Sequence, residues 1–170
     1  MNSDDLRALQ APLKDKYKVE PEAAVIVLKA RGELDSGGVV CRVETGKALV
    51  EAGLHPATGG SGELACSGNM LLDALVACAG VTLKAVATAI GFDLKSGTVS
   101  AEGDLDFRGT LGVAKDAPVG FQNIRLTFDL NTNEPQERID QLVKLTERYC
   151  VVYQTLAKPA HLSLTVRTSR

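Results

Sequence analysis

The sequence predicts an α+β protein in which antiparallel sheets pack around one long, buried helix. Residues 70–90 are apolar on nearly every face, which is typical of a helix enclosed in a core. Residues 98–107 and 124–130 alternate between polar and apolar side chains, as half-buried strands do. The 170-residue chain contains no internal repeat, so we expect residues 21–170 to form a single domain after a helical extension over residues 1–20.

The N-terminal part combines one short helix with a strand pair. Leucines at spacings of three and four predict an amphipathic helix over residues 4–16, which Pro12 should interrupt or shorten. The run of residues 23–28 is short and rich in β-branched side chains, and it predicts a strand that continues toward Arg31. Residues 39–44 predict the hairpin partner of this strand, because a serine- and glycine-rich turn separates the two runs.

The central helix follows a loop rich in glycine and proline over residues 54–62, and Ser67 is its expected cap. Asp73, Lys84 and many small residues make this helix a poor membrane span despite its length, so we expect no membrane partner. Beyond it, the two alternating strands are joined by a loop over residues 108–120, which is long enough to cover a cleft or an edge.

The C-terminal part predicts a second helix and a final strand. Pro135 suits the first position of a helix, and apolar residues then recur on one helical face. We expect this helix to continue through Cys150 to Tyr153. Residues 161–166 alternate as a strand would.

Composition and charge argue against several classes of function. The net charge of -2 and the lack of any long run of lysine or arginine argue against a nucleic-acid partner. The first residues are charged and lack the apolar segment of a signal peptide, so we expect a cytoplasmic protein. Four cysteines without a CxxC pair, together with two histidines, favour neither a disulfide framework nor a zinc site. No glycine motif for phosphate binding is present. The four thiols are therefore either packing residues or reactive groups.

Two of the cysteines lie in sequence motifs that resemble those of a known protein family. Cys78 lies near the middle of the central helix in LLDALVACAG, and Cys150 lies about seventy residues later in ERYCVVYQTL. With the order of the predicted elements, these motifs resemble the OsmC/Ohr family of thiol-dependent hydroperoxide reductases. The resemblance covers most of the chain from Ala23 onward. It implies an OsmC-like fold and an intertwined homodimer with its sites at the subunit boundary.

The resemblance implies a thiol peroxidase that acts on organic or lipid hydroperoxides. Cys78 would attack the O–O bond and become a sulfenic acid, and Cys150 would condense with it to a disulfide. An external dithiol would reduce this disulfide, and no bound cofactor is implied. A thiol inside an apolar helix is expected to have a raised pKa, so an arginine must supply positive charge. In the family it comes from the early strands, and Arg31 is our first candidate, with Arg42 second.

The sequence departs from the family pattern at two places. The family has a Pro-Glu pair about ten residues before the first cysteine, where this chain has Ser-Gly-Asn at residues 67–69. Glu63 and Asp73 are nearby carboxylates that would orient the arginine, although neither matches the motif. The proline that usually follows the second cysteine is replaced by Val151.

Two functions of different class remain open. One is the peroxidase, for which a pocket of apolar side chains would suit a fatty-acyl chain better than hydrogen peroxide. We expect this pocket to be lined by Met70, Leu71, Leu75 and Phe121. The alternative is a non-peroxidatic relative that binds a small apolar ligand in the dimer pocket, since buried cysteines are often inert. Cys66 is an alternative resolving thiol, and His55 is interpreted as a loop residue that lines the approach to the site.

Overall fold

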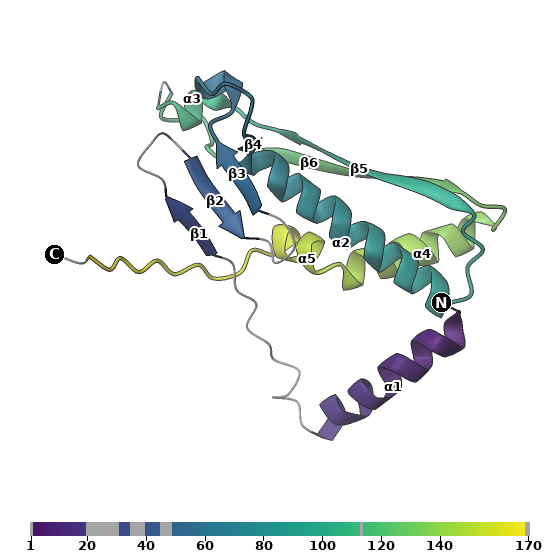
Figure 1. The fold of residues 1–170 in the computed structure, drawn as a ribbon. Coiled ribbons are helices and arrows are strands. Elements are labelled where there is room, and N and C mark those ends of the chain that lie inside the picture. The colour runs from purple at the N-terminus through teal and green to yellow at the C-terminus, as the bar shows by residue number, and fades with distance from the viewer. Residues whose placement is uncertain (1, 20–30, 35–39, 45–48, 113, 169–170) are drawn as a thin grey trace.

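A computed structural model describes residues 2–19, 31–34, 40–44, 49–112 and 114–168. It contains two sheets and several helices, which confirms the predicted α+β class. The longest element is α2 (Ser67–Ala89), a helix of 23 residues that corresponds to the predicted central helix. A long hairpin lies over α2 and the C-terminal helices, and the other sheet lies toward the N-terminal end of α2 (Figure 1).

The first sheet has four strands in the order β1-β2-β3-β4. The strands are β1 (Arg31–Leu34), β2 (Val40–Glu44), β3 (Leu49–Gly53) and β4 (Ala65–Cys66). β1 and β2 pair antiparallel, as the predicted hairpin requires, whereas the strand expected over residues 23–28 lies outside the described residues. β3 is not predicted by the sequence pattern. β4 pairs parallel with β3 and leads directly into α2, whose N-cap is Cys66 rather than the expected Ser67.

The second sheet is an antiparallel hairpin of β5 (Ser96–Asp104) and β6 (Asn123–Asn131). Both strands follow the predicted alternation, and every second side chain of β6 from Ile124 to Leu130 is half-buried. The predicted loop between them contains a short helix, α3 (Phe107–Thr110). Phe121, just before β6, packs on Gly103 of β5 so closely that a Cβ atom at that position would collide with its ring.

The C-terminal helical region is broken, contrary to the prediction of one continuous helix. α4 (Gln136–Tyr149) ends at Cys150, and α5 (Val151–Ala157) begins there in a new direction. Pro135 caps α4 and lies one position before its first helical residue. α4 and α5 both contact α2.

The core lies where α2, α4 and the hairpin meet. Its buried side chains are Leu83, Val86, Ala87, Phe92 and Leu142. Only one side of α2 is buried, however, because Leu71 is exposed and Val81 is 72% exposed. The expectation of a helix enclosed on every face is therefore wrong for the single chain. By length and composition α2 could also cross a membrane, but core helices of soluble proteins meet the same criterion.

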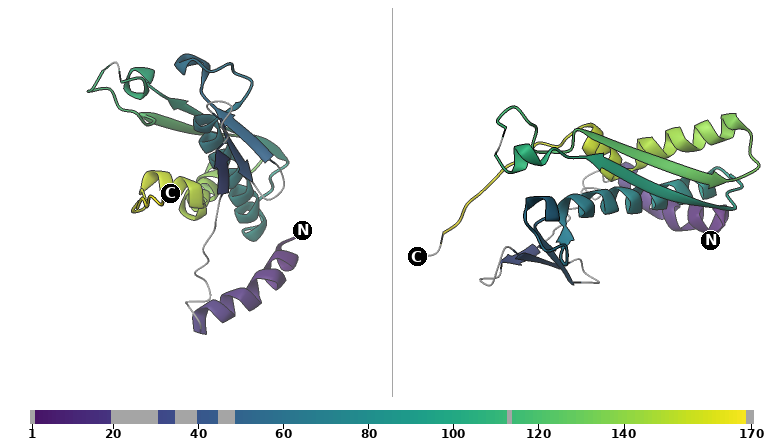
Figure 2. Two further views of the ribbon diagram at one scale, coloured as in Figure 1. Left: turned by 60° about the vertical axis from the view of Figure 1, so that its left-hand side comes forward. Right: turned by 90° about the horizontal axis from the view of Figure 1, so that it is seen from above.

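The C-terminal segment of residues 159–168 forms no strand, so the strand predicted over residues 161–166 is wrong for the single chain. Leu162 is 90% exposed and Leu164 is 87% exposed. The segment runs outward from the rest of the chain (Figures 1 and 2). A strand needs a neighbour for its main-chain hydrogen bonds, and no described strand pairs with this segment.

The N-terminal helix α1 (Ser3–Val19) is continuous through Pro12, so the predicted interruption is wrong. A proline removes one N–H donor from a helix, and the remaining 17-residue helix tolerates this loss. α1 contacts α2. The division of the chain into an extension and one domain stays a prediction.

Candidate active site

Cys150 lies at the corner between α4 and α5. Its backbone is extended (φ -74°, ψ 109°), so it serves both as the C-cap of α4 and as the N-cap of α5. Its N–H donates to the carbonyl of Thr146 at 2.9 Å, and its carbonyl accepts from the N–H of Gln154 at 2.9 Å. The side chain of Gln154 also donates to the carbonyl of Glu147 at 2.9 Å. These bonds fix the corner and direct the first N–H groups of α5 toward α2.

The corner brings Cys150 together with Cys78 of α2. The two thiols lie close enough for each to shift the pKa of the other. Cys150 is only 1% exposed, whereas Cys78 is half-buried, and both thiols are free. The structure thus brings together the two cysteines that the sequence motifs single out.

The surroundings of Cys78 lower the pKa of its thiol. Burial on its own raises this pKa, but hydrogen bonds that stabilise the thiolate outweigh burial. The donors are the main-chain N–H groups of Val152 and Val151, the Cys150 thiol and the Thr82 hydroxyl. The expectation of a raised pKa is therefore wrong. Among the described residues, main-chain and uncharged groups stabilise the thiolate.

The pKa of Cys150 is raised instead. Burial is the main cause, and the hydrogen bond to Cys78 and its negative charge add to it. The two thiols are therefore unequal. Cys78 ionises more readily, and Cys150 retains its proton as a hydrogen-bond donor.

The two candidate arginines are placed only by their main chains. Arg31 is the first residue of β1, opposite Glu44, and Arg42 in β2 lies opposite Glu33 and Glu51. Their side chains lie outside the described part of the chain. The activating role of Arg31, or of Arg42, stays a prediction.

The other sequence candidates do not meet at Cys78. Asp73 is exposed and lies five residues before Cys78, which is about 140° around the helix. Glu63 is exposed in the loop before β4. Cys66 lies twelve residues before Cys78, a helical rise of about 18 Å. No disulfide spans that distance, so Cys66 is not the resolving thiol for Cys78 within one chain.

His55 has a structural role in the described part of the chain. Its ring stacks on Phe107 of α3 with 4.8 Å between ring centroids. Its Nδ1 accepts a hydrogen bond from the N–H of Ala57 at 3.1 Å and caps the short 3-10 helix η2 (Pro56–Thr58). His55 thus joins two loops near the start of α2.

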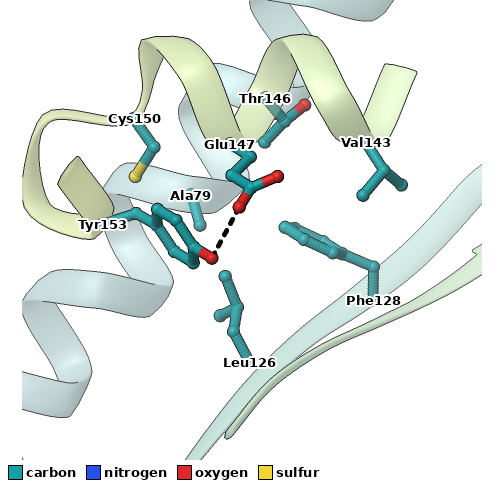
Figure 3. A pocket seen from close by; sticks show the side chains of 8 residues that line it. All are labelled: Ala79, Leu126, Phe128, Val143, Thr146, Glu147, Cys150 and Tyr153. Carbon is teal, nitrogen blue, oxygen red and sulfur yellow. Dashed lines mark hydrogen bonds between the residues drawn. The ribbon is translucent and has the colours of Figure 1, made fainter. Parts of the chain in front are cut away.

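Two adjacent cavities lie near the corner, and only the first is lined by one of the two thiols. The first has a volume of about 190 Å³, and its lining side chains include Glu147, Cys150 and Tyr153 (Figure 3). The second has a volume of about 420 Å³ and is lined by Leu75 and Phe121, two of the four residues expected for an apolar pocket. Tyr153 lines both cavities. Cys78 lines neither of them, and Met70 and Leu71 do not line the second.

Residues 60–165, more than half of the chain, match the profile of the OsmC-like protein family. The chain belongs to this family. The match includes both Cys78 and Cys150 but neither candidate arginine. No curated protein sequence matches this OsmC-like protein.

Solved structures share the fold of this OsmC-like protein. An OsmC like protein from Mycoplasma pneumoniae is 14% identical over 79% of this chain and 89% of its own, with a TM-score of 0.65. The organic hydroperoxide resistance protein OsmC from Legionella pneumophila is 16% identical over 79% of this chain and 92% of its own, with a TM-score of 0.61. Organic hydroperoxide resistance protein OhrB of Bacillus subtilis is 18% identical over 80% and 94%, with a TM-score of 0.52. At these identities, the likeness establishes the fold alone.

Several groups at the site of this OsmC-like protein are not apparent from the residue pattern. The main-chain donors of Val151 and Val152 depend on the corner at Cys150, which no residue pattern signals. Glu147 did have a signal, because it lies three residues before Cys150 on a predicted helix and so shares a helical face with it. Among the described residues, no group of three His, Cys, Asp or Glu side chains could hold a metal ion.

Proposed function

We propose that this OsmC-like protein is a thiol-dependent peroxidase that reduces organic hydroperoxides with Cys78 and Cys150. The observation that carries the proposal is the contact between two unequal thiols. Cys78 has a lowered pKa, and the protonated thiol of Cys150 lies beside it. The thiolate is the nucleophilic form of cysteine, so this pair separates an attacking sulfur from a resolving one.

The proposed reaction has three steps. The Cys78 thiolate attacks one oxygen of the hydroperoxide, the O–O bond breaks, and the alkoxide takes a proton and leaves as an alcohol. Cys78 then carries a sulfenic acid, which the Cys150 sulfur attacks to form a disulfide and release water. An external dithiol reduces this disulfide and is itself oxidised to a disulfide. The cycle requires no bound cofactor, and a cytoplasmic location would supply the reduced dithiol.

An organic or lipid hydroperoxide is the substrate class we favour. The larger of these two cavities has a volume within the range of small-molecule sites, and its lining combines the apolar side chains of Leu75 and Phe121 with the polar side chain of Gln122. Leu75 precedes Cys78 by less than one turn of α2. An alkyl chain held there would place its peroxide group near Cys78. The names of the relatives from Legionella pneumophila and Bacillus subtilis support the same substrate class.

The proposal includes a homodimer. The single chain leaves an apolar stripe of α2 exposed at spacings of three and four residues, made of Leu71, Ala74, Ala77 and Val81. Among the described residues, no strand pairs with the alternating C-terminal segment, residues 159–168. A second copy would cover both surfaces, and Cys78 would then lie beside the subunit boundary because it neighbours Ala77 on α2.

Single-turnover thiol titration tests the function. After one equivalent of cumene hydroperoxide, the reduced protein should lose two thiols rapidly. Cys78→Ser should abolish this loss, and Cys150→Ser should convert it to a trapped sulfenic acid on Cys78. Cys66→Ser is the matched control and should behave as wild type, because Cys66 is far from both sulfurs.

A wild-type protein that keeps all its thiols over minutes at neutral pH would overturn the peroxidase. The non-peroxidatic alternative would then be pursued by measuring the binding of fatty acids to the larger cavity.

A further inference from the structure

Glu147 lines the same cavity as Cys150, and the reaction described above does not use it. It lies in the last turn of α4, three residues before Cys150. Side chains at this spacing lie on one helical face with about 5–6 Å between their Cβ atoms. Figure 3 shows the carboxylate of Glu147 and the sulfur of Cys150 both pointing toward Tyr153.

The Glu147 carboxylate is held in place from α5. The phenol of Tyr153 donates a hydrogen bond to its Oε1 at 2.7 Å. The carbonyl of Glu147 also accepts a hydrogen bond from the side chain of Gln154 at 2.9 Å. Two successive residues of α5 therefore fix both the main chain and the side chain of Glu147 across the corner. The hydrogen bond with Glu147 raises the pKa of Tyr153, so the phenol stays protonated and remains a donor.

The resolving step needs a group that accepts a proton. Cys150 is 1% exposed and carries its proton, which it must lose when its sulfur attacks the sulfenic acid on Cys78. Glu147 is the one carboxylate among the described residues that line this cavity, and it is exposed to solvent. It therefore connects a buried thiol with bulk water.

We propose that Glu147 is the general base of the resolving step and that Tyr153 is the residue that positions it. The proposal rests on the peroxidase function proposed above. As the Cys150 sulfur bonds to the Cys78 sulfur, the S–O bond of the sulfenic acid breaks. The Cys150 proton passes to the Glu147 carboxylate. The hydroxide that leaves takes a proton from solvent to become water, and Glu147 then returns its own proton to solvent.

A direct route competes with this proposal. The Cys150 thiol lies beside the Cys78 sulfur in the reduced protein and lowers the pKa of Cys78. Its proton could therefore pass straight to the hydroxyl group that leaves Cys78, without a base. The two routes differ in whether the resolving step depends on residue 147.

Rapid mixing of the reduced protein with one equivalent of cumene hydroperoxide separates the two chemical steps. A dimedone-type probe reports the sulfenic acid on Cys78, and quenching with an alkylating agent followed by mass spectrometry reports the disulfide. Glu147→Gln should leave sulfenic acid formation unchanged and slow disulfide formation about 10²-fold, a common effect of losing a general base. The slowed step should accelerate as pH rises, because hydroxide then deprotonates Cys150 directly.

Three further variants sharpen this test. Glu147→Asp keeps a carboxylate and should restore part of the rate of disulfide formation. Tyr153→Phe removes the bond that positions Glu147 and should give an intermediate rate with a pH dependence like that of Glu147→Gln. Glu137→Gln makes the same change in the first turn of α4, far from Cys150, and should match wild type.

Disulfide formation at the wild-type rate and with the wild-type pH profile in Glu147→Gln would overturn the proposal in favour of the direct route. Failure of the proposed function would look different, because wild type itself would then form no sulfenic acid on Cys78.

Discussion

Cys78 depends on main-chain groups for part of its thiolate stabilisation. The N–H groups of Val151 and Val152 belong to the backbone, so almost any change of these side chains leaves the donors in place. Proline is the exception, because it has no N–H. Val151 is the position where a proline is best tolerated, as the first residue of α5.

Val151→Pro should raise the pKa of Cys78. The side chain of Val151 is largely exposed, and the extended backbone of Cys150 suits a following proline, so α5 should persist with one donor fewer. Cys78 would then ionise at higher pH. The pH dependence of the alkylation of Cys78 by iodoacetamide, followed by mass spectrometry, should show a midpoint shifted upward from that of wild type.

Val151→Ala keeps the N–H and should leave this midpoint unchanged. An unchanged midpoint in Val151→Pro, with α5 intact by circular dichroism, would mean that the Val151 donor does not stabilise the thiolate.

At the level of single residues, the sequence identifies the two cysteines but not the groups that surround them. Cys78 and Cys150 are visible as residue types in two motifs. The donors to Cys78 are not visible, because main-chain direction at Val151 depends on the extended backbone of Cys150. The segment RYCVVYQTL carries no proline or glycine to mark a break, so its pattern predicts a continuous helix.

Among the elements, α2 and α4 are linked at the end of α2 that lies away from the first sheet. Carbonyl groups in the last turn of a helix lack partners within the helix. The Arg138 guanidinium of α4 donates to the carbonyls of Ile90 at 3.2 Å and Gly91 at 3.1 Å. It also pairs with Glu134 at 3.3 Å and lies 5.9 Å from the ring centroid of Phe92. One side chain thus closes the end of α2 and joins it to the core.

Arg138→Ala should lower the free energy of unfolding by about 1–2 kcal/mol, because it leaves two carbonyls and one carboxylate without their charged donor. Urea denaturation followed by circular dichroism measures the change. Arg138→Lys should lose less, since a lysine retains the charge but not the fork of donors. The same urea midpoint in wild type and Arg138→Ala would show that solvent replaces these bonds at no cost.

Elements with strong periodicity are predicted from the sequence, and elements that depend on a neighbour are not. The alternation in β6 and the apolar length of α2 are both visible in the sequence, and the structure has a strand and a long helix at these places. β3 has the sequence LVEAG, which shows little alternation, and it becomes a strand because β2 and β4 pair with its two edges. Residues 161–166 are the reverse case, since the strand pattern is present but no described strand lies beside them to pair with.

For the whole molecule, the apolar pattern of residues 70–90 exceeds what one chain buries. The single chain encloses only one side of α2, and the proposed second copy would account for the apolar side chains that remain exposed. This difference is one reason why the proposed function includes a second copy. The fold and the family were predictable because they depend on element order and on two motifs, while the homodimer follows from the family resemblance and stays a prediction.

Replacing both Leu162 and Leu164 with aspartate should convert the proposed dimer into a monomer. A charge on the apolar face of residues 161–166 would oppose its pairing with a second copy. Light scattering coupled to size-exclusion chromatography should give twice the 18.0 kDa chain mass for wild type and the chain mass for the variant.

Aspartates at Ser163 and Thr165, on the opposite face of the segment, serve as the control and should leave the dimer intact. A wild-type protein that is monomeric at micromolar concentration would contradict the assembly.

If the proposed disulfide forms, the contact between Cys78 and Cys150 would also link peroxide exposure to heat resistance. A covalent bond between the two sulfurs would tie α2 to the corner between α4 and α5 across about seventy residues of chain. Such a cross-link restricts the unfolded chain and commonly adds about 4 kcal/mol for a loop of this length. A molecule that has just consumed a peroxide would therefore be harder to melt than one awaiting its substrate. The reductant, in restoring activity, would return the protein to its less stable form.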